Sequence, residues 1–219
     1  MSYLLELKEV SLAYDDNFIF KNLDLTLNEN EIITIKTGVL DGGSSLLQIC
    51  NSSLNVQSGN IFYKGVNTKK LSDSQLFKTV GMQLESEGLL SMYTVLENCK
   101  LPISFHSKLN NTEIEKNIFY ISAKFEFDYL LNKYPYQLND VQLRLANLLR
   151  LLSSNPKIFL LDEIQSGMSD KLRAGLLDKL IKHLKEQEIS LIMTITAGDM
   201  DYFADQKLEI NNLQLNRHK

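Results

Sequence analysis

The sequence predicts an α/β fold in which helices pack on a largely parallel sheet. Three observations predict it. A β-branched run at 32–35 is followed by a glycine turn and a helical segment, residues 94–153 have a helical pattern, and an apolar strand at 157–161 is followed by a helix and another strand. Strands that alternate with helices in this way are typical of parallel sheets covered by helices.

The N-terminal part of the chain predicts a small antiparallel arrangement followed by a buried strand. Residues 4–10 and 20–27 alternate apolar and polar side chains, as half-exposed strands do, and residues 15–17 supply a turn between them. The continuous run at 32–35 is typical of a strand buried on both faces. The further elements expected here are a glycine turn at 42–43, a helix at 44–49, a strand at 61–63 and a turn at 64–65.

The remainder of the chain predicts a helical insertion and then a return to strand–helix–strand order. Thr112 and Glu115 have the form of a capping box ahead of an apolar helical spacing, so a helix is expected to begin there. The last expected elements are a strand at 157–161 that ends in Asp162-Glu163, a helix at 171–188, a strand at 190–195, and strands at 208–210 and 213–215 that flank a two-residue turn at Asn211-Asn212.

Length, charge and cysteine content narrow the class of protein. A chain of 219 residues fits one ordinary domain or one large two-lobed domain. It should bury roughly 70% of its unfolded surface, so its core needs no disulfide or metal to hold it together. Cys50 and Cys99 lack metal-ligand spacing, which excludes a disulfide scaffold and a CxxC zinc site and fits a reducing cytosol. A net charge of −4 argues against nucleic-acid binding. No apolar run approaches the ~20 residues of a membrane helix and no signal peptide is visible, so a role at a membrane would depend on a partner.

The motifs of the chain resemble, in order and spacing, those of the nucleotide-binding subunit of ABC transporters. The matching segments are an aromatic-ended strand, the start of a phosphate-loop strand, a Q-loop with its flanking strand and helix, the approach to a signature motif, and a Walker B strand with its exit: residues 10–14, 30–32, 80–98, 134–138 and 155–167. The resemblance implies a RecA-like P-loop NTPase core with an antiparallel β subdomain (1–85 and 154–219) and an inserted α-helical lobe (86–153), in one cassette of residues 1–219. It also implies a membrane permease and a second cassette, identical or different, as partners, and a cytoplasmic position on the inner face of the cell membrane.

The expected phosphate loop lacks its lysine. In a loop of the form GxxxxGK[ST], backbone N–H groups cradle the phosphates, the lysine neutralises the β and γ oxygens, and the hydroxyl holds magnesium. Counting from Glu31 puts Gly43 at the lysine position and Ser44 at the metal hydroxyl, whereas counting from Gly38 puts Ser44 at the lysine position. A plain glycine turn between strand and helix explains the same residues. The residues expected to form a weak or vestigial nucleotide site are Tyr14, Gly38, Gly42, Gly43, Ser44, Ser45 and Glu85.

The Q-loop and the signature motif also depart from the family. Glu85 takes the place of the Q-loop glutamine, near where the γ-phosphate of a nucleotide would lie. Two like charges ~4 Å apart cost ~4 kcal/mol at an effective dielectric constant of 20, unless a cation lies between them. This glutamate is either a solvated loop residue or a new metal ligand. The signature segment reads Asn139, Asp140, Val141, Gln142 and has lost both glycines. We expect Asp140 to cap the following helix and to place a negative charge where a phosphate should dock.

The Walker B acids are retained, but the loops that follow are changed. Asp162 is placed to support Mg²⁺ together with Ser44, and Glu163 to polarise the attacking water. Ser169 stands at the position of the dimer-contacting aspartate, unless Asp170 substitutes for it, and residues 196–199 replace the switch histidine.

Together these departures predict a pseudo-ATPase that binds ATP and Mg²⁺ weakly or not at all and keeps Glu163 as a vestige, because two acids cannot accelerate phosphoryl transfer without a positioned, neutralised triphosphate. One alternative is an active ATPase that uses rearranged residues such as Lys36. Another is a regulatory or DNA-associated protein of the same fold.

The segment after the Q-loop is the expected docking site for a permease. It is apolar for a connecting loop, and the residues expected to line a docking groove are Glu87, Leu89, Leu90, Met92 and Tyr93. Burial against the helical lobe would explain the same pattern. Residues 88–106 also resemble the corresponding stretch of Mla/Mce-type lipid-transport ATPases, which suggests lipids as cargo.

Overall fold

A computed structural model describes residues 3–15, 17–38, 40–84 and 88–217. Its strands are β1 (Leu5–Tyr14), β2 (Asn17–Leu27), β3 (Ile32–Lys36), β4 (Ser58–Tyr63), β5 (Val66–Asn67), β6 (Val80–Gln83), β7 (Ile158–Leu161), β8 (Ser190–Ile195), β9 (Gln206–Asn211) and β10 (Gln214–Arg217). Its helices are α1 (Gly43–Cys50), α2 (Asp73–Thr79), α3 (Val95–His106), α4 (Asn111–Phe125), α5 (Asp140–Ser154) and α6 (Asp170–Glu186), with short 3₁₀ turns at Thr68–Lys70, Asp128–Leu130 and Pro135–Gln137.

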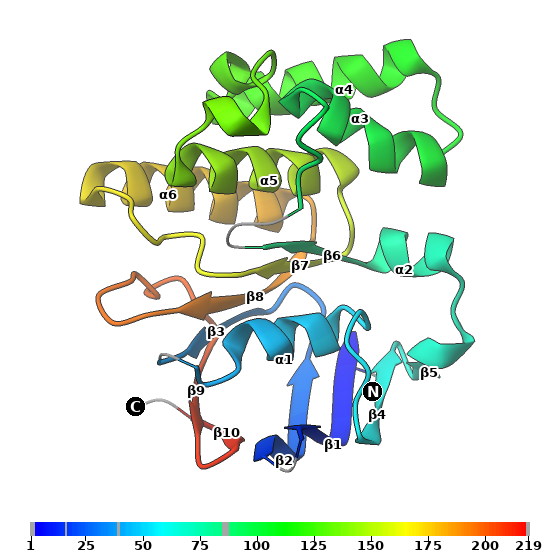
Figure 1. Cartoon of the computed structure of the whole chain (residues 1–219), viewed down its shortest axis with the longest axis vertical. Coiled ribbons are helices and arrows are strands. Elements are labelled where there is room, and N and C mark those ends of the chain that lie inside the picture. Colours follow the sequence, from blue (N-terminus) through cyan, green and yellow to red (C-terminus); the bar gives the residue numbers. More distant parts are fainter. Residues whose placement is uncertain (1–2, 16, 39, 85–87, 218–219) are drawn as a thin grey trace.

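The strands form two sheets, and helices cover the larger one (Figure 1). The smaller sheet has the order β2-β1-β4-β5 and is antiparallel throughout. The larger sheet has the order β10-β9-β3-β8-β7-β6, and its pairs are parallel except for the β9–β10 hairpin. The α/β fold predicted from the sequence is therefore confirmed.

Two apolar cores lie on the two faces of the larger sheet. Residues of β3 alternate between them: Ile33 and Ile35 pack with α1 and the antiparallel sheet, whereas Ile32 belongs to the core formed with the helices on the other face. β7 alternates in the same way, with Ile158 and Leu160 in the first core and Phe159 and Leu161 in the second. This division explains why β7 is apolar throughout and why every residue of β3 from Ile32 to Ile35 is buried, Thr34 included.

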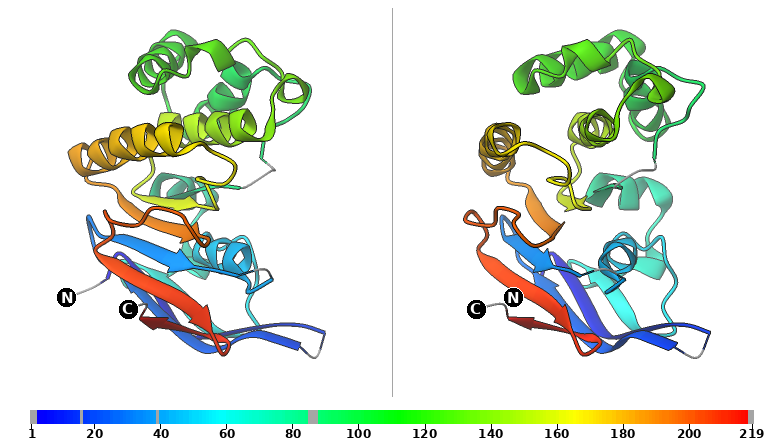
Figure 2. Two further views of the ribbon diagram at one scale, coloured as in Figure 1. Left: turned by 90° about the vertical axis from the view of Figure 1, so that its left-hand side faces the viewer. Right: turned by 60° about the vertical axis from the view of Figure 1, so that its left-hand side comes forward.

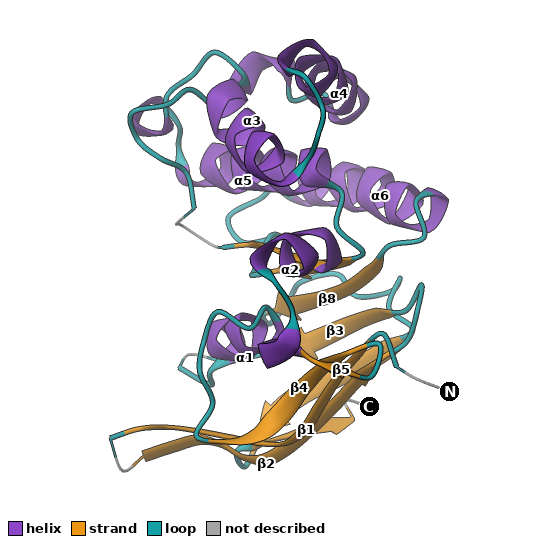
Figure 3. Cartoon of the chain, turned by 90° about the vertical axis from the view of Figure 1, so that its right-hand side faces the viewer, coloured by secondary structure: helices purple, strands orange, loops and turns teal. Residues whose placement is uncertain are grey.

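The helical insertion forms a lobe at one end of the molecule, with the antiparallel sheet and both termini toward the other end (Figures 2 and 3). α3, α4 and α5 pack on one another, and α5 also packs against β6. The start of α4 differs from the prediction: its capping box is Asn110 with Glu113 rather than Thr112 with Glu115, and an amide oxygen caps a helix as well as a hydroxyl does.

Two other local expectations need correction. The C-terminal hairpin turns at Asn212-Leu213, both with left-handed φ, one residue later than predicted, and Asn211 is the last residue of β9. Helix α2 is an addition to the predicted elements. It begins with a Ser72–Gln75 capping box but buries none of its residues, so no apolar period marked it in the sequence. Among the described helices, none has the length and apolarity required to cross a bilayer.

Candidate functional site

The loop that joins β3 to α1 is the centre of the expected nucleotide site. Lys36 ends β3 and Gly43 opens α1, so either register places a residue without an amine at the lysine position. Gly42 precedes the helix with φ 87°, and no side chain caps the helix start. Leu40, at the tip of the loop, has φ 64° and is 93% exposed. The first amides of α1 are therefore not covered by a capping side chain.

Asp41 folds back over the first glycine of this loop. Its Oδ2 accepts a hydrogen bond from the Gly38 N–H at 2.6 Å. A Cβ atom added to Gly38 would lie 2.7 Å from the same oxygen, so the carboxylate sits directly against the glycine. Asp41 is not among the site residues predicted from the sequence, although an acid inside a phosphate-loop frame is a signal that could identify it.

The start of α1 packs closely on the ends of β3 and β8. A Cβ atom on Gly43 would lie 2.7 Å from Thr37 Cγ2 and 3.3 Å from Thr194 Cγ2, which explains a glycine there. Tyr14, at the end of β1, is 49% exposed, and its hydroxyl lies 3.5 Å from Ser45 Oγ. The structure therefore brings the expected aromatic from the other sheet to the start of the helix.

The Walker B acids lie at the carboxyl end of β7, beside β8. Asp162 is 4% exposed, and its Oδ1 accepts a hydrogen bond from Thr194 Oγ1 at 2.9 Å. The Glu163 N–H donates to the same threonine oxygen at 3.0 Å, and Glu163 has a left-handed φ of 45°. Because the Thr194 methyl group also lies against Gly43, the two acids and the start of α1 share one neighbour. Open α/β sheets bind ligands at this edge.

The segment after the acids is tied to the loop after β8. The Gln165 side chain makes two hydrogen bonds with the backbone of Met200, at 2.8 Å and 2.9 Å. Arg173 of α6 donates to Gly198 O at 2.9 Å and to Met168 O at 3.4 Å. Ser169 caps α6, and its neighbour Asp170 is 92% exposed. The sequence motifs predict none of these contacts.

The signature segment opens α5 with a self-contained cap. Asn139, and not Asp140 as predicted, is the N-cap. Its side chain accepts a hydrogen bond from the Gln142 N–H at 2.9 Å, and the Gln142 side chain accepts one from the Asn139 N–H at 3.2 Å. Asp140 occupies the first helical position and is exposed, because the amide one residue earlier already fills the cap. Val141 lies near Gly167 and packs against the helical core.

The segment expected to dock a permease is organised by Asn98 of α3. This side chain is 2% exposed. It accepts from the Leu90 N–H at 2.7 Å and donates to the carbonyls of Leu90, Tyr93 and Thr94 at 3.1, 3.1 and 2.9 Å. Leu90, Met92 and Tyr93 are 47%, 76% and 37% exposed, whereas Leu89 packs against the helical core. Glu85 and Glu87 lie outside the described residues.

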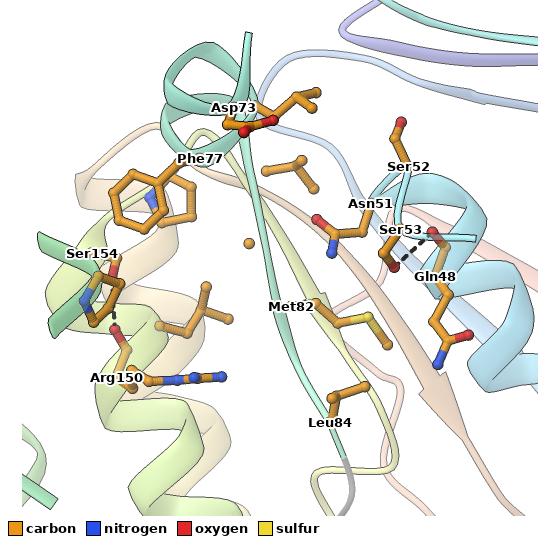
Figure 4. A pocket seen from close by; sticks show the side chains of 16 residues that line it. Gln48, Asn51, Ser52, Ser53, Asp73, Phe77, Met82, Leu84, Arg150 and Ser154 are labelled. Carbon is orange, nitrogen blue, oxygen red and sulfur yellow. Dashed lines mark hydrogen bonds between the residues drawn. The ribbon is translucent and has the colours of Figure 1, made fainter. Parts of the chain in front are cut away.

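A cleft of about 550 Å³ opens beside this segment, between α1, α2, β6 and α5 (Figure 4). Gln48, Asn51 and Ser53 line one side, with Phe77 and Arg150 opposite. Burial lowers the pKa of Arg150, whose guanidinium donates to the Gly88 carbonyl. The described residues predicted for the docking groove do not line this cleft, which is formed by the sheet edge and the ends of the helices instead.

Comparison with known proteins decides the family. The family model described as ABC transporter matches residues 20–166. The chain belongs to the ABC transporter family. The match to this ATP-binding cassette family extends from β2 through the phosphate-loop region and the helical lobe to the exit of the Walker B strand.

Individual relatives support the cassette assignment. The methionine import ATP-binding protein MetN 1 of Pseudomonas putida is 28% identical over 172 residues, covering 77% of this chain and 51% of that protein. The glutamine transport ATP-binding protein GlnQ of Geobacillus stearothermophilus is 26% identical over 200 residues, covering 90% of this chain and 83% of that protein. The chain thus spans about half the length of the MetN relatives.

A solved cassette has the same fold along nearly the whole chain. The dimeric, post-hydrolysis structure of the ATP-binding cassette MJ0796 bound to ADP and Pi superposes with a TM-score of 0.87 at 22% identity, and the match covers 98% of this chain and 97% of that one.

Proposed function

We propose that this cassette is a catalytically degenerate subunit that docks on a membrane permease and does not drive it by ATP hydrolysis. The observation that carries the proposal is the loop between β3 and α1, which offers no amine in either register and holds a carboxylate against Gly38. Phosphoryl transfer depends on positioning the phosphates and neutralising their charge, and this loop does the reverse.

The loop residues do not fit a magnesium triphosphate as they stand. Asp41 already accepts from the Gly38 N–H, so a phosphate oxygen would compete with a negative group for that donor. The Thr37 methyl group fills the space that a side chain at position 43 would need. Ser44 and Asp162 remain the residues placed for a metal. These contacts support weak or absent binding of ATP and Mg²⁺.

The active-ATPase alternative would require Lys36 to supply the missing charge. Side chains of a strand alternate between the two faces of its sheet. Ile35 and Ile33 point to the core that contains α1, so Lys36 follows Ile32 to the opposite face. Its stem would have to double back around the strand end to reach the loop, which disfavours this alternative.

Docking on a permease is supported by an exposed apolar segment on a rigid base. The Asn98 hydrogen bonds fix the backbone on both sides of Met92, at Leu90 and at Tyr93, so little additional ordering of the loop is needed when a partner binds the exposed side chains. Replacing both by aspartate should release the folded protein from membranes that contain the permease. The same change at Phe105 and Leu109, which match them in exposure at 76% and 47%, is the control and should leave binding intact. A folded Leu90→Asp, Met92→Asp variant that stays fully membrane-bound would place the docking site elsewhere.

The partner, location and cargo follow from the proposed role. The cassette would lie in the cytoplasm against the inner face of the cell membrane and pair with an identical or a competent cassette, and this pairing would be independent of its own nucleotide. Lipid cargo remains a prediction from residues 88–106. The relatives reported above are named for methionine and glutamine, so transport of vesicle lipid against transport of radiolabelled amino acids by the purified complex would decide the substrate class.

A further inference from the structure

Two segments that are far apart in sequence are held together by buried polar side chains. One is residues 164–168, directly after the Walker B acids, and the other is residues 196–200, directly after β8. Gln165, which is 1% exposed, meets the backbone of Met200 with both ends of its amide: Nε2 donates to the carbonyl at 2.8 Å and Oε1 accepts from the N–H at 2.9 Å. Both polar groups of the side chain are thereby satisfied across 35 residues of sequence.

Arg173 makes a second bridge between the same segments. Its Nη1 donates to Gly198 O at 2.9 Å and its Nη2 to Met168 O at 3.4 Å. Nη1 also lies 3.9 Å from Asp199 Oδ1, and that aspartate side chain is only 4% exposed. A planar guanidinium can serve two carbonyls at fixed spacing, whereas the ammonium of a lysine acts as a point charge.

Hydrogen bonds within residues 196–200 also hold this second segment in a closed turn. Asp199 Oδ2 accepts from the Thr196 N–H at 2.9 Å and from the Thr196 hydroxyl at 3.2 Å. Gly198 has φ 91°, and no atom lies within 4 Å of where its Cβ would be. The turn is therefore closed by its own side chains and then attached to the neighbouring segment by Gln165 and Arg173.

We propose that Gln165 and Arg173 form a latch that makes these two segments one rigid unit whose position does not depend on nucleotide. The proposal rests on the proposed function in one respect, that no bound nucleotide is needed to order this side of the site. Gln165 and Arg173 are positioning residues, since they act through the backbones of Met168, Gly198 and Met200.

Amide hydrogen exchange of the full chain tests the latch. In the wild-type protein, peptides covering 164–170 and 196–201 should open together, and 5 mM Mg-ATP should not change their protection. Arg173→Met should accelerate exchange about tenfold or more in both peptides, because each loses a hydrogen bond. Arg173→Lys should restore protection only in part. Lys182→Met removes a cation from an exposed position on the same helix and should change neither peptide.

A second variant keeps the proposal falsifiable if Arg173→Met fails to fold. Gly198→Ala forces a side chain into a left-handed backbone at the residue whose carbonyl accepts from Arg173, while both latch side chains are kept, and it should loosen residues 164–168 as well as its own turn. Acceleration in only one of the two peptides, in either variant, overturns the latch. A change of tenfold in the protection of wild-type peptide 196–201 on addition of Mg-ATP overturns it as well. Hydrolysis of ATP with unchanged protection would contradict the proposed function and leave the latch standing.

Discussion

Replacing Asn98 by alanine should destabilise the cassette by about 3 kcal/mol. The side chain is 2% exposed and makes four contacts of hydrogen-bond length with the backbone of residues 90–94. Its two amide hydrogens and one oxygen can form about three full bonds at once, and each such bond contributes about 1 kcal/mol net. The free energy of unfolding, measured by urea denaturation, gives the magnitude directly.

Asn117 provides the matched control. It is also an asparagine on a helix of the lobe, but its side chain makes a single hydrogen bond, to Ser153 O at 2.9 Å. Asn117→Ala should therefore cost about 1 kcal/mol. The variant Asn98→Asp keeps an acceptor for the Leu90 N–H but turns a carboxylate toward three carbonyls, so it should be at least as unstable as Asn98→Ala. An Asn98→Ala variant no less stable than Asn117→Ala would show that the additional hydrogen bonds of Asn98 do not stabilise the cassette.

Three further outcomes follow from the site and the core. Asp41→Ser should raise the affinity for Mg-ATP in titration calorimetry, because it removes the carboxylate from the Gly38 N–H, and the charge-matched Asp170→Ser should not. Gly43→Lys alone should lower the melting temperature, since its Cβ would lie 2.7 Å from Thr37 Cγ2, and adding Thr37→Ser, which removes that methyl group but keeps the hydroxyl that donates to Ile195 O, should recover part of the loss and strengthen nucleotide binding. Burial and a nearby lysine lower the pKa of His183 to about 4, so the unfolded chain takes up the proton first. The unfolding free energy should then fall by at most about 3 kcal/mol between pH 6.5 and pH 4, and His183→Gln should flatten that dependence.

Local sequence signals predicted most of the fold because the strand segments and the helical segments of this chain follow different spacings of apolar residues. The residues of 32–35 and of 158–161 are divided between two cores, and burial on both faces explains why these strands lack an alternation of apolar and polar side chains. The predicted start of a helix was wrong where two neighbouring polar residues could each act as the N-cap. Asn139 rather than Asp140 caps α5, since either side chain can accept from the same amides.

Site residues could be predicted from the sequence only where they belong to a motif of contiguous residues. Tyr14 and Ser45 were predicted from two such motifs, and in the structure the Tyr14 hydroxyl lies 3.5 Å from Ser45 Oγ. In contrast, Gln165 bonds to a backbone 35 residues distant and Arg173 to a carbonyl 25 residues distant, and no pattern along the chain marks such partners. Asn98 lies in the segment 80–98 that resembles the Q-loop region of the family, but its hydrogen bonds to the preceding loop become visible only in the folded chain.

Phosphate release by the purified chain tests most directly whether this cassette lacks ATPase activity of its own, as we propose. With saturating Mg-ATP, the wild-type protein and the Glu163→Gln variant should release phosphate at the same background rate, because the loop before α1 has no amine at the lysine position and holds the Asp41 carboxylate on the Gly38 N–H. A wild-type turnover rate clearly above background that disappears in Glu163→Gln would show that the cassette is an active ATPase and would contradict the account.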